Sequence, residues 1–248
     1  MHVYTYICIK DMKTILHTAD SRGHANHGWL DSWHTFSFGH YYDPSRVRFG
    51  VLRVLNDDTV AGGMGFGRHP HDNMEIISIP LEGDLKHQDS MGNVAVIKHG
   101  DIQVMSAGTG IQHSEQNAHT DRPVKFLQIW VMPNKQNVTP RYDQITLNSA
   151  DSKNTLQQVL SPNADDAGVW IHQHAWFHLG TFDAGMRATY TQKVAENGTY
   201  FFVLEGSFII NNQQLNRRDG LGVEENSIHS IEALSSDSKI LVIEVPMG

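Results

Sequence analysis

The sequence is nearly devoid of cysteine and carries no excess of positive charge. Cys8 is the one cysteine among 248 residues, so a disulfide within the chain is excluded. The 27 acidic residues outnumber the 19 lysines and arginines, and the formal net charge is −8. Because phosphate groups are bound through clustered positive charge, we expect no direct contact with nucleic acid and none with an anionic membrane surface.

Long apolar stretches are missing as well. The sequence has no run of 18 apolar residues, which is about the length that a membrane-spanning helix requires. Residues 1–12 lack the positive and apolar regions of a secretory signal, and we expect a cytoplasmic protein. The stretch from Met12 onward reads like a natural start, so residues 1–11 are expected to be an N-terminal extension or to reflect an alternative start.

Helical periodicity is weak throughout, whereas glycine is frequent, with 21 residues. Short runs of β-branched and aromatic residues lie between the glycines, at 49–55, 74–81, 93–98, 102–105, 125–132, 186–194, 200–204, 208–211 and 239–245. Short strands with regular turn signals are typical of a β-sandwich or β-barrel. The sequence therefore predicts an all-β fold.

A faint internal repeat divides the chain in two. Leu-Glu-Gly follows a strand-like run at both 81–83 and 204–206, and the two copies are 123 residues apart. Each copy is followed by another strand and then by adjacent Asp and Gly residues, at 100–101 and 219–220. Two similar β-barrels in tandem are the simplest explanation, although Leu-Glu-Gly is also a common turn.

The division between the two halves is expected near a polar segment. Residues 133–143 are polar and contain two prolines, which is typical of a linker. We expect a metal-binding N-terminal domain at 12–135, a linker at 136–144 and a C-terminal domain without metal ligands at 145–248.

Histidine is unusually abundant, with 16 residues, roughly three times the average usage. His69 and His71 flank Pro70, and residues two apart in a strand face the same side. Both imidazoles would thus project into the interior of a barrel. Neutral imidazole is a good ligand for Fe, Ni, Cu, Zn and Mn.

A second pair with the same spacing strengthens this prediction. His113 and Glu115 are also two residues apart, and a small barrel could bring them opposite the first pair. Glu75 has the same parity as His69 and His71, so spacing alone does not choose between the two carboxylates. The alternative without a metal is a group of buried histidines hydrogen-bonded to carboxylates, which would demand many polar partners.

These residues resemble known motifs. The pattern Gly-x5-His-x-His-x3-Glu at 63–75 resembles the cupin superfamily. Longer strings resemble the pirin family, at 28–38, 41–44, 66–71, 87–90, 105–115 and 128–133. The similarity is dense over residues 20–145, whereas the C-terminal half is similar in style only.

The resemblance implies a bicupin, that is, two tandem jelly-roll barrels, with one metal site in the first. It implies His69, His71, His113 and Glu115 as ligands, which leaves Glu75 beside a ligand histidine. In the second barrel, a shift of 123 residues puts Gln192 and Val194 at the first two ligand positions, so no metal is expected there. A further pair, His172 and His174, is expected to have surface or packing roles, with adventitious metal binding as the alternative.

The resemblance also implies an activity. Bacterial pirin-like proteins are associated with quercetin 2,3-dioxygenase activity, in which O2 opens a flavonol ring. The implied partners are a small planar aromatic substrate and O2, and the cofactor is one divalent transition metal, with Fe(II) first and Mn, Ni, Cu, Co or Zn as alternatives. Glu115 or Glu75 would accept the substrate's hydroxyl proton.

Candidate apolar walls of the substrate pocket are Trp33, Phe36, Phe38 and Phe66, although core packing is the favoured role for each of them taken singly. The alternative function is a non-enzymatic metal- or redox-sensing regulator that binds a protein partner. We expect a monomer in either case.

Overall fold

A computed structural model describes residues 13–248, and the extension expected at residues 1–11 lies outside them. Strands make up nearly all of the regular structure. The helices are two short 3-10 turns, η1 (Ala19–Ser21) and η2 (Ser149–Ser152), and no helix in the described range is long and apolar enough to cross a membrane. The predicted all-β fold is confirmed.

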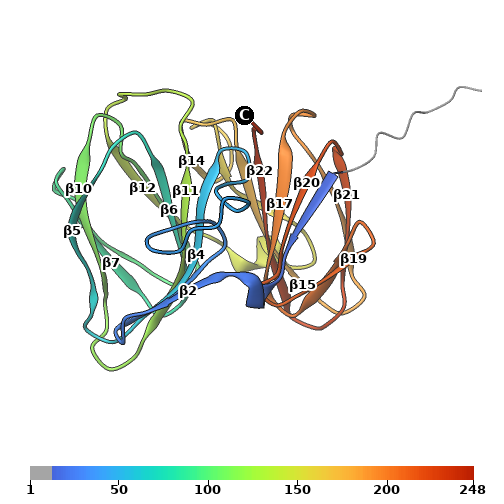
Figure 1. The fold of residues 1–248 in the computed structure, drawn as a ribbon, viewed down its shortest axis with the longest axis horizontal. Coiled ribbons are helices and arrows are strands. Elements are labelled where there is room, and N and C mark those ends of the chain that lie inside the picture. The colour runs from blue at the N-terminus through green and yellow to red at the C-terminus, as the bar shows by residue number, and fades with distance from the viewer. Residues whose placement is uncertain (1–12) are drawn as a thin grey trace, which may run out of the picture.

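Two β-barrels lie side by side, each built from a seven-stranded and a four-stranded sheet (Figure 1). In the first barrel the larger sheet has the order β12-β9-β6-β11-β4-β3-β2 and the smaller one β5-β10-β7-β8. The strands of the first barrel are β2 (Gly23–Asn26), β3 (Leu30–His34), β4 (Leu52–Val60), β5 (Gly65–His71), β6 (Glu75–Glu82), β7 (Leu85–Asp89), β8 (Val94–Ile97), β9 (Asp101–Ser106), β10 (Ile111–Asn117), β11 (Val124–Val131) and β12 (Arg141–Thr146).

The second barrel repeats this arrangement, with sheets ordered β1-β20-β17-β22-β15-β13-β14 and β16-β21-β18-β19. Its strands are β1 (Lys13–His17), β13 (Gln157–Ser161), β14 (Val169–Trp170), β15 (Trp176–Phe182), β16 (Arg187–Thr191), β17 (Gly198–Glu205), β18 (Ser207–Ile210), β19 (Gln213–Asn216), β20 (Gly220–Glu224), β21 (Ile228–Ala233) and β22 (Ser238–Val245). The bicupin architecture is therefore confirmed.

The Leu-Glu-Gly repeat marks the same turn in both barrels. Gly83 follows β6 and Gly206 follows β17, and both glycines have φ of 73°. This left-handed conformation favours glycine because a Cβ atom would be strained there. A Cβ on Gly206 would also lie 2.2 Å from the hydroxyl of Ser238, so the glycine is required on two grounds.

The polypeptide passes from one barrel to the other twice, once before the first strand of the first barrel and once after its last strand. β1 precedes the first barrel in sequence but pairs with β20 of the second. β12 overlaps the predicted linker at 136–144, yet it pairs with β9 and completes the first barrel. The two strands occupy matching places, so the predicted boundaries at residues 12, 135 and 145 do not follow the strand pairing.

The largest apolar cluster lies between the barrels. Strand alternation turns Ile77 of β6 and Ile129 of β11 toward the second barrel, where they join Phe177 and Tyr200 in one buried cluster. Each fully buried large apolar side chain contributes roughly 1.5–3 kcal/mol. The seven-stranded sheets therefore form a common core that holds the two barrels together.

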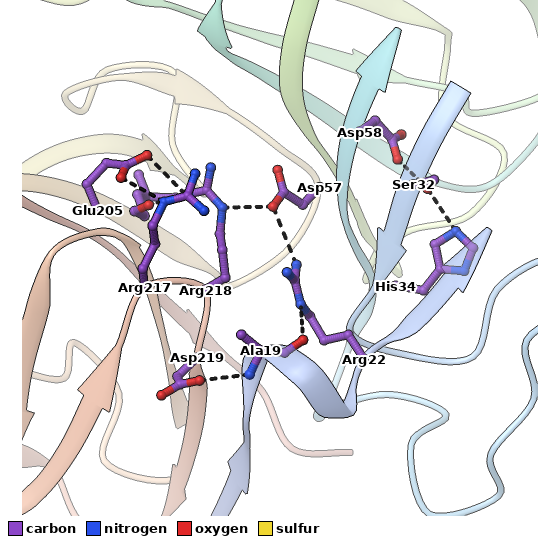
Figure 2. A network of polar contacts seen from close by, with 11 residues as sticks. Ala19, Arg22, Ser32, His34, Asp57, Asp58, Glu205, Arg217, Arg218 and Asp219 are labelled. Atoms are coloured by element: carbon purple, nitrogen blue, oxygen red, sulfur yellow. Dashed lines mark hydrogen bonds and ion pairs between the residues drawn. The ribbon is translucent and has the colours of Figure 1, made fainter. Parts of the chain in front are cut away.

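An ion-pair network ties the same interface together (Figure 2). Asp57 of β4 accepts from Arg218 of the second barrel, with Nε to Oδ2 at 2.7 Å. Arg22 approaches the same carboxylate at 3.5 Å, and the backbone N–H of Ala19 donates to Asp219 at 2.7 Å. Because neighbouring residues of a strand face opposite sides, Asp57 joins this interface while Asp58 faces the interior of the first barrel.

Candidate metal centre

Two antiparallel strands of the first barrel carry the predicted histidines. β10 pairs with β5 so that His113 lies opposite His69 and Ile111 lies opposite His71. The register shifts between His113 and Glu115, which is the signature of a β-bulge, a feature common next to functional sites. Pairing thus brings together side chains that are more than 40 positions apart in sequence.

Three imidazoles form a compact cluster. The ring centroids of His69 and His71 are 4.8 Å apart, those of His69 and His113 4.4 Å, and those of His71 and His113 4.9 Å. One nitrogen from each ring can be chosen so that all three lie within 4.8 Å of one another. This spacing fits three ligands converging on one ion.

The hydrogen bonding of these rings fits a divalent metal. Neither nitrogen of the buried His113 has a hydrogen-bond partner among the described residues, which is costly for a polar group without a ligand. The Nδ1 of His69 lies 2.8 Å from the carbonyl oxygen of Gly67. A donor at Nδ1 leaves Nε2 as a free lone pair, the arrangement that ligand histidines usually adopt.

Burial keeps the rings of His71 and His113 neutral. Burial, with smaller contributions from His69, His71 and His87, lowers the pKa of His113 to about 2. Burial and His69 likewise lower the pKa of His71 to about 4. Neutral imidazole is the form that binds a metal, so His71 and His113 need no deprotonation at neutral pH.

Glu115 lies at the buried side of the cluster. Its carboxylate accepts from Ser78 Oγ at 2.9 Å and from Gln128 Nε2 at 2.6 Å. Burial raises the pKa of Glu115 to about 7, although both hydrogen bonds act to lower it. Its oxygen groups with His113 and His87, within 4.8 Å of both, rather than with His69 and His71.

His87 is a candidate ligand or ligand neighbour that the sequence analysis did not single out. It is fully buried, its ring centroid lies 5.3 Å from that of His113, and its Nε2 lies 3.2 Å from Asp89 Oδ2. Its Nδ1 has no partner in residues 13–248. Alternation along β7 was a usable signal, since His87 and Asp89 are two residues apart.

Glu75 lies elsewhere. It accepts from Ser106 Oγ at 2.7 Å and from the backbone N–H of His172 in the second barrel. It shares the face of β6 with Ile77, which packs between the barrels. Asn73, with φ of 45°, lies in the turn between β5 and β6, so parity with His69 and His71 does not carry across it. The structure does not bring Glu75 to the cluster.

A cavity of about 440 Å³ opens beside the histidines. Of the four predicted apolar wall residues, Phe38 and Phe66 line it. Phe36 instead packs in the core between the barrels. Trp33 is not a lining residue, but its ring stacks on that of His24, which does line the cavity, with centroids 4.1 Å apart. Trp130, whose ring lies 4.9 Å from that of His71, is a wall that the sequence analysis missed.

A row of polar side chains crosses the inner face of the large sheet. Strand pairing aligns them at one level, in the order His34, Asn56, Gln128, Ser78 and Gln103. All five are buried. Several of their polar atoms have no partner in the described chain, among them Asn56 Oδ1 and Gln128 Oε1. The interior at this level is therefore suited to a polar ligand.

Comparison with known proteins agrees with this geometry. Residues 16–131 match the pirin family, and residues 158–245 match the quercetinase C-terminal cupin domain. The chain is 44% identical over 231 residues to a quercetin 2,3-dioxygenase of Escherichia coli K12, covering 93% of this chain and 98% of that protein. The chain belongs to the pirin family.

Solved pirin structures extend the comparison. The crystal structure of YhhW from Escherichia coli superposes with a TM-score of 0.90 at 42% identity, covering 95% of this chain and 99% of that one. The bacterial pirin YhhW in complex with nickel(II) superposes with a TM-score of 0.89 at the same identity, covering 95% and 100%. A divalent-metal site of histidine and glutamate is thus consistent with both the family and the donor set.

The other histidine pair of this pirin lies outside the cluster. The ring of His172 packs edge-on against Trp170, with centroids 4.8 Å apart, and His174 is exposed. Neither belongs to a group of potential metal ligands within residues 13–248. Their surroundings fit the predicted packing and surface roles.

Proposed function

We propose that this pirin is a metal-dependent dioxygenase that cleaves flavonols such as quercetin with O2. The observation that carries the proposal is the cluster of His69, His71 and His113 beside a cavity of about 440 Å³. Cavities of about 300–1,000 Å³ with apolar walls and a few polar groups are typical of small-molecule sites. The names of the relatives from Escherichia coli support the same activity.

We further propose His69, His71, His113 and Glu115 as the ligands of one divalent metal, with Fe(II) as the native ion. Mn, Ni, Cu, Co and Zn remain alternatives, because imidazole and carboxylate ligands suit several of these ions. When bound, the metal would act as a Lewis acid on the flavonol oxygens and support the reaction with O2. The unpartnered nitrogens of His113 support this assignment.

The chain's own residues would bind and orient the substrate. Phe38, Phe66 and Trp130 line the cavity and would pack against the planar rings of a flavonol while excluding water. Asn56 Oδ1 and Gln128 Oε1, which lack partners in the described chain, would accept hydrogen bonds from substrate hydroxyls. Glu115 would serve as a ligand held in place by Ser78 and Gln128 rather than as a freely moving base.

The decisive experiment is reconstitution without oxygen. The purified chain is loaded with Fe(II), mixed with quercetin and exposed to O2. We expect the flavonol absorbance to bleach and carbon monoxide to be released. Arg187→Ala, an exposed change in the second barrel, serves as the control that retains activity. If neither signal appears with Fe, Mn, Ni or Cu, the dioxygenase proposal fails and the regulatory alternative is favoured.

A further inference from the structure

Three buried side chains form a hydrogen-bonded chain in the wall of the same cavity (Figure 2). Ser32 of β3 lies directly opposite Asp58 of β4, and its hydroxyl donates to Asp58 Oδ1. The Nε2 of His34 lies 2.8 Å from the same hydroxyl oxygen. The exposed fractions of Ser32, His34 and Asp58 are only 3%, 4% and 3%, so water has little access to the chain.

The bonding pattern determines which nitrogen of His34 carries a proton. With Asp58 ionised, the Ser32 hydroxyl donates to the carboxylate, and its oxygen therefore accepts from His34 Nε2–H. The other nitrogen, Nδ1, is then a lone pair. It is buried and has no partner within residues 13–248, and His34 lines the cavity. The hydrogen-bonded series from Asp58 through Ser32 thus ends at His34 Nδ1, a nitrogen that can accept a hydrogen bond from a ligand.

We propose that His34, backed by Ser32 and Asp58, accepts the hydroxyl proton of the bound substrate. This inference rests on the proposed flavonol cleavage. The substrate O–H bond breaks as an N–H bond forms at His34 Nδ1. The proton on Nε2 passes to Ser32 Oγ, and the Ser32 proton passes to Asp58. One proton moves from substrate to Asp58, one negative charge moves the other way, and no electron is transferred.

The surroundings favour Asp58 as the final acceptor. Burial raises the pKa of Asp58 to about 7, assisted by nearby carboxylates and opposed by the Ser32 hydrogen bond. Burial also lowers the pKa of His34 to about 4, so the proton is passed on rather than kept as imidazolium. The charged or titratable neighbours of the two groups are Asp31, Asp57, Glu115, Arg22, His24 and His27.

The second barrel has no such chain. Matching the strands by their pairing places Gly180 of β15 where Asp58 stands, since Gly180 lies opposite Ile240 as Asp58 lies opposite Phe126. Burying an ionisable carboxyl in a barrel is unfavourable unless it has a role or strong partners. The second barrel also buries a carboxyl group, that of Glu244, but Tyr190, Asn197 and two backbone N–H groups satisfy it. Asp58 accepts from Ser32, which joins it to the cavity through His34, and this link supports a role in the chemistry there.

The test uses Ser32→Ala and Asp58→Asn, each loaded with the metal that gives activity in the wild type. Ser32→Ala breaks the chain, and Asp58→Asn keeps its shape but removes the final acceptor. We expect kcat with quercetin to fall about 100-fold in both, the lower range for a proton-transfer group. Ser32→Thr keeps a hydroxyl and should recover activity. Thr59→Ala, which changes β4 on the opposite face, should retain it.

Two readouts separate proton transfer from a packing defect. Quercetin bound without O2 should show the red-shifted absorbance of the deprotonated flavonol in the wild type but not in Ser32→Ala. The acid limb of the kcat profile should disappear in Asp58→Asn. Metal content and thermal unfolding identify any variant that has misfolded.

The possible outcomes differ for the two proposals. Metal-loaded variants with wild-type kcat, red shift and pH profile would overturn the relay while leaving flavonol cleavage intact. A wild type that neither deprotonates nor cleaves quercetin with any tested metal would overturn the proposed function and the relay together. Loss of activity that Ser32→Thr recovers, together with loss of the red shift, would support the relay.

Discussion

The two barrels share one strand frame but have opposite interiors. Ser78 and Phe201 occupy equivalent positions, because each lies five residues before the glycine of Leu-Glu-Gly. Their partners on the neighbouring strand, Gln128 and Val242, are therefore equivalent as well. In the smaller sheets, Glu115 pairs with His87 of β7, and Ile231 pairs with Ile210 of β18. Because β7 and β18 both follow Leu-Glu-Gly, Glu115 and Ile231 occupy equivalent positions. The second barrel fills most of its interior with one continuous apolar cluster, and its buried Glu244 is satisfied by Tyr190 and Asn197. The first barrel has two smaller clusters with the polar site residues between them.

This difference indicates that one copy of the repeated fold contributes mainly to stability and the other to ligand binding. The apolar interior of the second barrel stabilises the pair through burial of hydrocarbon surface. The interior of the first barrel buries less hydrocarbon surface, because imidazoles, amides and carboxyl groups occupy part of it. These groups need a ligand to complete their hydrogen bonding or coordination. One histidine is common to both, since His229 occupies the place of His113. His178 also lies inside the second barrel, where its ring contacts that of Tyr190 with centroids 5.0 Å apart. Among the described residues no group of potential metal ligands forms there, and the cluster in the first barrel is what distinguishes the two barrels.

The sharpest test of the comparison between the barrels is to substitute the two matching histidines, His113 and His229, one at a time. We expect His113→Ala, like His69→Ala, to reduce bound metal from about one ion per chain to near zero, because one of few ligands is lost. His229→Ala should retain the metal. Metal content of the purified proteins is the measurement, and unchanged stoichiometry in His113→Ala or His69→Ala would contradict the ligand assignment.

The matched pair Phe201 and Ser78 tests the roles of the two interiors. Phe201→Ala should lower the free energy of unfolding by about 3–5 kcal/mol, because it opens a cavity in a close-packed core. Ser78→Ala should cost about 1 kcal/mol, the typical value of one hydrogen bond. Urea unfolding of the metal-free proteins measures both. Equal losses would mean that the two interiors are not specialised as we describe.

His229 gives the second barrel a dependence on pH that can be isolated. Burial lowers its pKa to about 4, below the unfolded value, so the unfolded state binds the proton first as pH falls. This contribution to stability is present above about pH 6.5 and is lost toward pH 4. His229→Gln should therefore reduce the loss of unfolding free energy between pH 7 and pH 5 by about 2 kcal/mol. Unfolding at the two pH values, with the wild type as control, decides this.

The smallest expected effect is the difference in metal affinity between substitutions of Glu115 and of Glu75. We expect Glu115→Gln to weaken metal binding about tenfold, and Glu75→Gln to change it less than about twofold, because Glu75 lies between the barrels and not at the cluster. Competition with a chelator measures both affinities. The reverse order would assign the carboxylate ligand to Glu75.

Local patterns in the sequence predicted a large part of this molecule. Alternation with glycine turns predicted the strands and the all-β class, and the spacing of two copies of Leu-Glu-Gly predicted two barrels. The same period of two indicated that His69 and His71 would point the same way, as would His113 and Glu115. Each inference depends on a few neighbouring residues, which explains why it could be drawn without the fold.

Other features depended on contacts that the chain order does not express. The pairing of β1 with the second barrel was missed. The pairing of β12 with the first barrel was also missed, because a polar edge strand such as β12 resembles a linker in composition. Parity placed Glu75 with the histidines until the turn at Asn73 reversed the face of β6. His87 carried the correct alternation, but only its approach to His113 identified it.

The sequence by itself determined which residues within each strand share a face, because side chains alternate with a fixed period of two along any strand. Only the tertiary structure decided which strands lie opposite one another, because pairing register depends on residues distant in the chain. That pairing brings three histidines to one point, aligns the polar row from His34 to Gln103, and completes the chain from Asp58 to His34. The same pairing in the second barrel encloses an apolar core.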